Sequence, residues 1–380
     1  MHRCATTLAI IAAIITLGQT MSIGQAREAS GAREAKRPIS AATYVCPPCG
    51  LECDNRTFDK PGACPVCGMK LVEKESIKTV AILMFDHVQI IDYSGPWEVF
   101  GEAGFKVFTV ADGVAPITTV FGQKVTPDYS FENSPRADIL LVPGGGVGNA
   151  SNNSKLIKWI QDNAKESTYV MSVCTGAFLL AKAGLLDGLT ATTVRGGIDR
   201  LAEAAPKTTV VYDQRYVDNG KIITTAGLSS GIDGAFHLLS KIVGEGDAER
   251  TALGMEYRWD PQSTYARAAL PDRYLPDFSA IDGKILSTSG DMDKWEVRAV
   301  VWAPDSVAGI IDSISKQIAA ATPHTRSAPK VGERTGTPES AEIRWTLTDE
   351  KRRNWNGSAV AQPAPGEKGR FIVVVKLSRA

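Results

Sequence analysis

The feature that most constrains the fold of this chain is a series of short apolar runs separated by segments with helical periodicity. Helical patterns such as residues 154–164 lie between the runs. Strands that alternate with helices form βαβ units, in which helices cover both faces of a parallel sheet. We therefore expect a doubly wound, mostly parallel α/β domain over residues 77–262. Its buried strands are predicted at 78–85 (KTVAILMF), 104–111 (GFKVFTVA), 137–143 (ADILLVP) and 168–173 (TYVMSV).

Two turns follow these strands at the edge where sites form in such sheets. The glycines of Pro143-Gly-Gly-Gly146 allow backbone N–H groups to approach a ligand closely. Cys174 follows the fourth run and precedes a helical pattern over 178–183. A thiol at a helix start feels the positive end of the helix dipole, which lowers its pKa and favours the thiolate. Cys174 is the candidate nucleophile, although an inert core cysteine also fits the local sequence.

A wider set of motifs resembles the PfpI-type superfamily, whose domains have a flavodoxin-like, class I glutamine amidotransferase-like fold. The similarity is greatest to isonitrile hydratase and to amidotransferase-like sensor domains of transcription regulators. The motifs run in one order along the chain: Phe85-Asp86, IDYSGPWEVF at 91–100, the Pro143 turn, SVCTG at 172–176, AGLLDG at 183–188, ATT at 191–193 and TAGLSSGID at 225–233.

This resemblance implies a role for each matching residue. Cys174 would be the nucleophile, Asp92 the acidic residue that faces its thiol, and Thr175 the hydratase-type neighbour. The backbone amides of Gly145 and Thr175 would form an oxyanion hole, and Asp92 would shuttle a proton if burial raises its pKa. The alternative for Asp92 is a helix cap.

The chain departs from relatives that pair the cysteine with histidine. Those relatives place histidine directly after the cysteine or after the Ala-Thr-Thr stretch, where this sequence has Thr175 and Val194. A protease-like Cys-His-acid mechanism is therefore disfavoured. We expect no cofactor in this domain.

Residues 44–75 contain two Cys-x-x-Cys pairs, Cys46/Cys49 and Cys64/Cys67, together with Cys53. Each pair can present two thiolates from a tight turn, and four thiolates suit a tetrahedral Zn²⁺ ion. So short a segment cannot bury much of a core, so metal or disulfides must hold it together. Two disulfides with one thiol left over are the alternative.

This segment resembles the short heavy-metal-binding domain of metal-efflux proteins, through YVCPPC at 44–49 and KPGACPVCGMKL at 60–71. Cys49 stands where that family usually has histidine, which makes the site softer and suits Zn²⁺ or Cu⁺. Cys53 is expected to be a spare ligand or a redox thiol.

The chain begins with features of an export signal. Residues 1–26 have Arg3, then an apolar run too short to span a bilayer, then small residues before a cleavage point. Residues 27–43 are typical of a flexible linker. We expect a periplasmic or extracellular protein with no membrane span after cleavage. The 42 basic and 42 acidic residues give no net charge, which disfavours nucleic-acid binding.

Residues 263–380 resemble no family that we recognise, and their patterns predict a small α+β region. We expect strands at 294–302, 341–347 and 371–377, a helix at 305–321, and a loop at 322–340. No helix-turn-helix signature is visible, which weakens the interpretation as a transcription regulator.

The sequence thus predicts an exported protein with a reactive Cys174 that performs hydratase, hydrolase or lyase chemistry on a small molecule, coupled to a metal-binding module. The alternative is a metal- or redox-responsive protein that binds a ligand without turnover. The resemblance also implies a homodimer.

Overall fold

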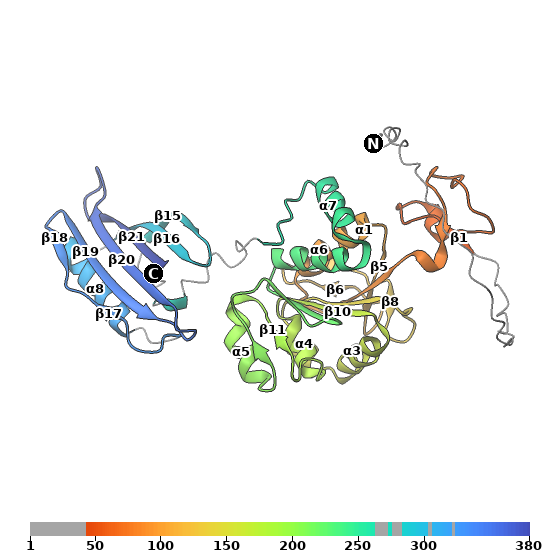
Figure 1. Ribbon diagram of the computed structural model, residues 1–380, viewed down its shortest axis with the longest axis horizontal. Coiled ribbons are helices and arrows are strands. Elements are labelled where there is room, and N and C mark those ends of the chain that lie inside the picture. Colours follow the sequence, from red (N-terminus) through yellow and green to blue (C-terminus); the bar gives the residue numbers. More distant parts are fainter. Residues whose placement is uncertain (1–42, 263–272, 276–282, 303–305, 321–323) are drawn as a thin grey trace, which may run out of the picture. The chain divides into compact units, whose positions relative to one another are not determined.

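The computed structural model describes residues 43–262, 273–275, 283–302, 306–320 and 324–380 (Figure 1). The expected signal peptide and nearly all of the expected linker lie outside the described residues. Within the described ranges, the helices are too short or too polar to cross a membrane.

The cysteine-rich segment forms a small antiparallel sheet in the order β2-β1-β3. Its strands are two residues each: β1 (Tyr44–Val45), β2 (Thr57–Phe58) and β3 (Val72–Glu73), accompanied by the 3₁₀ turns η1 (Glu52–Asn55) and η2 (Lys74–Ser76). The buried cluster beneath this sheet consists of Cys46, Cys53, Cys64 and Leu71. The interior of this module is therefore mostly sulfur.

The central sheet has the order β13-β14-β10-β9-β4-β5-β8. All its pairs are parallel except β13 with β14, which confirms the doubly wound, mostly parallel prediction. The strands are β4 (Thr79–Leu83), β5 (Lys106–Ala111), β8 (Tyr129–Ser130), β9 (Ile139–Val142), β10 (Tyr169–Val173), β13 (Tyr216–Asp218) and β14 (Ile222–Thr225).

Helices cover both faces of this sheet (Figure 1). On one face lie α1 (Ile90–Glu102), α6 (Ser229–Val243) and α7 (Glu245–Gly254); on the other lie α3 (Ser154–Glu166), α4 (Gly176–Lys182) and α5 (Ile198–Ala204). The short α2 (Gly148–Asn152), η3 (Arg195–Gly197) and two strand pairs, β6 (Ile117–Thr118) with β7 (Lys124–Val125) and β11 (Thr190–Ala191) with β12 (Thr209–Val210), complete the domain. Strands β4, β9 and β10, which are buried except at the first residue of β4 and of β10, fix the loops that follow them at one edge.

The carboxy-terminal region is an antiparallel sheet in the order β15-β16-β21-β20-β19-β17, with β18 paired to β19. Helix α8 (Val307–Ala320) packs against β19 and β20 through a buried row of isoleucines. The strands are β15 (Gly283–Gly290), β16 (Lys294–Trp302), β17 (Lys330–Val331), β18 (Thr335–Thr337), β19 (Ser340–Thr348), β20 (Asn354–Pro363) and β21 (Arg370–Arg379).

The predicted helix and strands of this region are confirmed, but the predicted loop at 322–340 contains β17 and β18, and two further strands were missed. Strand β20 contains Gly357, which lowers strand propensity. That glycine lies opposite Trp345 of β19, and a Cβ atom there would collide with the indole ring. The glycine is therefore a packing requirement of the sheet rather than a strand breaker.

Candidate functional site

Cys174 lies on a sharp turn between β10 and α4, with a backbone φ of 56°. Positive φ is costly for a residue with a side chain, and such strain is typical of a nucleophile elbow. A Cβ at Gly144 would lie 2.5 Å from the Thr175 nitrogen and 2.8 Å from the Cys174 Cβ. The glycine turn after β9 therefore packs directly on the elbow, as the two-turn prediction requires.

Asp92 lies in the first turn of α1 and is completely buried. Its Oδ2 accepts a hydrogen bond from the Gly144 amide, and its Oδ1 accepts one from the Leu228 amide, each at 3.2 Å. The Cys174 thiol faces the same carboxylate. The residue that precedes α1 is Gln89, and the amides that bind Asp92 belong to other loops, so these bonds do not cap the helix. Asp92 instead joins the loops after β9 and β14 to the thiol.

Burial dominates the ionisation of this pair. It raises the pKa of Asp92 to about 6, against the opposing effect of the Cys174 thiol and the two amides. Burial, followed by the negative charge of Asp92, raises the pKa of Cys174 to about 12. The expected lowering of the thiol pKa by the helix start is therefore wrong. The Thr175 amide, next to the start of α4, lowers the thiol pKa, but burial and the charge of Asp92 outweigh it.

Thr175 and Gly145 bind each other. The Gly145 amide donates to Thr175 Oγ1 at 2.8 Å, and Thr175 Oγ1 donates to the Gly145 carbonyl at 2.9 Å. The Thr175 amide faces the Cys174 sulfur. In this conformation the Gly145 amide is engaged, so the expected two-amide oxyanion hole reduces to the Thr175 amide.

The two imidazoles of the central domain differ in surroundings. His87, in the loop after β4, is exposed, and its carbonyl accepts a hydrogen bond from the Gly146 amide at 2.8 Å. The His237 Nε2 lies 2.9 Å from an Asp218 oxygen, and its ring stacks on Tyr216. His237 is thus held in a structural contact.

All five cysteines predicted as metal ligands belong to groups of donor atoms that could hold a metal ion. The sulfurs of Cys46, Cys53, Cys64 and Cys67 all lie within 4.8 Å of one another. Cys53, expected to be spare, is completely buried, whereas Cys49 is partly exposed. Cys53 differs from Cys49 because it lies in the η1 turn, where it is the buried residue.

All the cysteines of the described residues are free thiols. The Sγ atoms of Cys46 and Cys67 are 3.2 Å apart, and those of Cys49 and Cys53 are 3.4 Å apart. A disulfide bond is about 2.05 Å long, whereas tetrahedral Zn²⁺ with bonds of about 2.3 Å separates its thiolates by about 3.8 Å. These separations are closer to a metal-thiolate arrangement than to disulfides.

The thiols of the module differ in acidity. Backbone amides, that of Cys67 foremost, lower the pKa of Cys64 to about 7. Burial raises the pKa of Cys53 to about 12. Because a metal binds the thiolate, the lowered pKa of Cys64 favours its role as a ligand.

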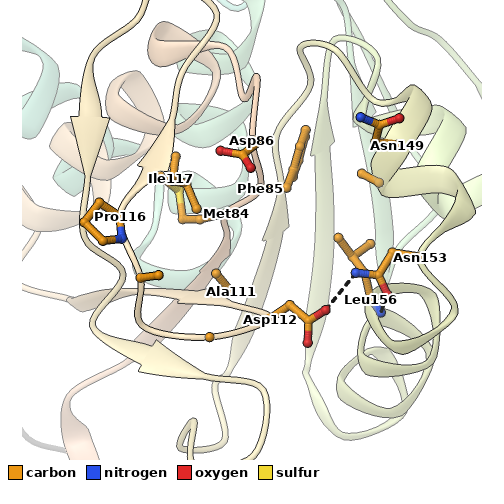
Figure 2. Close-up of a pocket in the computed structure, with 13 residues that line it drawn as sticks. Met84, Phe85, Asp86, Ala111, Asp112, Pro116, Ile117, Asn149, Asn153 and Leu156 are labelled. Atoms are coloured by element: carbon orange, nitrogen blue, oxygen red, sulfur yellow. Dashed lines mark hydrogen bonds between the residues drawn. The ribbon is translucent and has the colours of Figure 1, made fainter.

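A cavity of about 410 Å³ opens at the carboxyl ends of β4 and β5 (Figure 2). Its polar lining includes Asp86, Asp112, Asn149 and Asn153, and the Asn153 amide donates to Asp112 at 2.9 Å. No chemical role was predicted for these residues, although Asp86 belongs to the Phe85-Asp86 motif and Asp86 and Asp112 each follow a buried strand. The cavity is lined by neither Cys174 nor Asp92.

Comparisons with known proteins agree with both resemblances. Residues 78–241 match the DJ-1/PfpI family, and residues 43–74 match the heavy metal binding domain. An isonitrile hydratase of Pseudomonas putida is 34% identical over 180 residues, which are 47% of this chain and 78% of the hydratase. The HTH-type transcriptional regulator CdhR of Pseudomonas aeruginosa is 28% identical over 188 residues, 48% of this chain and 53% of the regulator. The crystal structure of a ThiJ/PfpI family protein from Pseudomonas syringae is 29% identical, with a TM-score of 0.46, over 49% of this chain and 78% of that one.

Proposed function

Because this chain belongs to the DJ-1/PfpI family, we propose that its central domain uses Cys174 for hydratase, hydrolase or lyase chemistry on a small molecule. The observation that carries this proposal is the Cys174 thiol on a positive-φ elbow, facing the buried Asp92 carboxylate. A thiol of high pKa needs an adjacent base to become a nucleophile, and Asp92 supplies one.

Within this group of reactions, hydration of an isonitrile is the most specific candidate, because an isonitrile hydratase is among the relatives. The Cys174 sulfur adds to the isonitrile carbon while its proton passes to Asp92. Asp92 then protonates that carbon, which gives a thioimidate. Water adds to the thioimidate carbon, the sulfur leaves as the thiol, and the product is an N-formyl amine. The Thr175 amide, which faces the sulfur, would bind charge that develops on the adduct.

A screen of small electrophiles, including isonitriles and glyoxals, tests the proposal on the wild type and Cys174→Ser. We expect turnover by the wild type and a loss of at least about 10³-fold in the variant. The matched control is Asp138→Asn, because Asp138 binds the Thr79 amide and hydroxyl at 2.9 Å, next to the start of β4. This control should retain activity. Equal turnover by Cys174→Ser would refute a nucleophilic role.

A second candidate is a ligand-binding protein without turnover, responsive to metal or oxidant. The raised pKa of Cys174 favours it, because a protonated thiol is a poor nucleophile. Regulators among the relatives are consistent with a sensing role. A ligand that raises the melting temperature of the wild type and is never converted would support this candidate over the enzyme.

The cysteine module is a heavy metal binding domain, and we propose Zn²⁺ or Cu⁺ as its ion. Cys46, Cys53, Cys64 and Cys67 fit such an ion, since they offer four soft donors around one point. The metal would supply the crosslink that this small module lacks. Elemental analysis of protein purified without reductant tests this proposal, and metal-free protein with two disulfides would overturn it.

Export and dimerisation are also proposed. The apolar run and small residues at 1–26 support cleavage near Ala26 and a periplasmic or extracellular location. The mass of the chain recovered from the cell envelope would test cleavage. Sedimentation would test the homodimer, which rests on the resemblance alone.

A further inference from the structure

The cysteine module contains more ligand atoms than one tetrahedral ion can use. Besides the four sulfurs of Cys46, Cys53, Cys64 and Cys67, a second group of four donors also lies within 4.8 Å of one another. This second group consists of Cys46, Cys49, Cys53 and the carboxylate of Asp54. The two groups share Cys46 and Cys53.

The shared residues have the surroundings that bridging ligands need. Cys46 and Cys53 are 2% and 0% exposed, so both sulfurs lie between the two groups rather than at the surface. A thiolate sulfur has more than one lone pair and can bind two metal ions at once. Cys64 and Cys67 then belong to one position alone, and Cys49 and Asp54 to the other.

Cys49 and Asp54 are held next to each other before any metal arrives. The two carboxylate oxygens of Asp54 accept hydrogen bonds from the Cys49 amide at 3.0 and 3.2 Å and from the Gly50 amide at 2.9 Å. The Cys49 thiol donates to Asp54 Oδ1 at 3.1 Å. When Cys49 loses its proton to a metal, Oδ1 loses that donor and has a lone pair free for the same ion.

The 3₁₀ turn η1 connects the two positions, because it carries both Cys53 and Asp54. Charge favours filling both. With one divalent ion in the inner position, four thiolates and the Asp54 carboxylate leave a net negative charge in a small volume while Cys49 keeps its proton. A second divalent ion that displaces this proton reduces the net negative charge.

We propose that this module binds two divalent, soft metal ions of the Zn²⁺ or Cd²⁺ kind, bridged by Cys46 and Cys53. The inner ion takes Cys46, Cys53, Cys64 and Cys67, and the outer ion takes Cys46, Cys53, Cys49 and Asp54. Each metal–sulfur bond replaces an S–H bond, and the protons pass to solvent, with no oxidation or reduction. This inference rests on the proposed role of the module as a metal site.

Native mass spectrometry of the reduced full-length protein, titrated with Cd²⁺, tests the second position. We expect two ions per wild-type chain and one per Cys49→Ala chain. Cys174→Ala is the matched control, since it removes a thiol outside the module, and it should still bind two. Asp54→Asn should weaken binding of the second ion at least about tenfold, because an amide is a poorer ligand than a carboxylate.

Cadmium NMR of the doubly loaded protein gives an independent readout. Two resonances with coupling between them are expected, because the ions share sulfur ligands, and only one resonance should remain in Cys49→Ala. One ion in both the wild type and Cys49→Ala would overturn the second position and leave the single site intact. No bound ion in the wild type would overturn the metal site itself. Retention of one ion by Cys49→Ala shows that the variant is folded.

Discussion

The two thiol sites of this chain differ in what surrounds the sulfur. Cys174 is a single thiol in a domain that has a large hydrophobic core of its own. Its burial and its neighbours determine the pKa of the thiol. The cysteines of the module are themselves the interior, because three two-residue strands bury little else. Substitution of Cys174 should change the chemistry of the protein. Loss of the metal or of its ligands in the module should change the folding of the module. The predictions below test this contrast.

Metal removal should have the largest effect, and only in the module. Structural Zn²⁺ contributes about 10–16 kcal/mol in small zinc domains. We therefore expect a chelator to abolish hydrogen-exchange protection of residues 43–76 while amides of β9 and β10 keep theirs. Equal protection of the module with and without metal would show that its strands are sufficient.

The pH dependence of stability should report Asp92. Its pKa rises from the usual 3.8 to about 6 on folding, so the folded chain binds more protons between these values. The free energy of unfolding should therefore fall as the pH rises from about 4 to about 6, by on the order of 3 kcal/mol, and this contribution is constant above. Urea titrations across this range measure it.

Asp92→Asn removes the titrating group and should flatten that fall. Asp138→Asn, which also removes a carboxylate that accepts two hydrogen bonds, should preserve it. An unchanged slope in Asp92→Asn would assign the pH dependence to other groups.

The close packing of the glycine turn on the elbow should appear as a smaller stability effect. Gly144→Ala places a Cβ 2.5 Å from the Thr175 nitrogen, so the turn must shift, at about 2 kcal/mol. Gly246→Ala in α7 is the control, because its Cβ would meet open space, and it should be neutral or slightly stabilising. The denaturant midpoints of the two variants measure this difference in stability. Equal midpoints would mean that the elbow accommodates the added Cβ atom at little cost.

The sequence predicted most of what periodicity and local chemistry determine. The parallel sheet followed from the runs that became β4, β5, β9 and β10, and the elbow followed from a cysteine directly after a strand. The features that the sequence did not predict depend on packing between residues far apart in the chain. Burial reversed the expected pKa shift of Cys174, and Thr175 captured the Gly145 amide. In the module, Cys-x-x-Cys spacing predicted Cys49 in the four-sulfur group, but that group contains Cys53, which is buried in the η1 turn. Cys49 lies in the second group of donors.

The smallest effect concerns the acidity of Cys174. Burial is the first cause of its raised pKa, and the charge of Asp92 is the second. Asp92→Asn removes the charge of Asp92 and the carboxylate's hydrogen bond with the thiol but leaves the burial. The thiol pKa should therefore fall by about one unit, equivalent to about 1.4 kcal/mol, and stay above its ordinary value. The rate of iodoacetamide labelling against pH measures this shift, with Cys174→Ser as the blank. If the wild-type thiol instead titrates below about 8.5, the helix start governs the sulfur and burial does not. In that case Cys174 is a preformed thiolate, and Asp92 is no longer needed as the base that activates it.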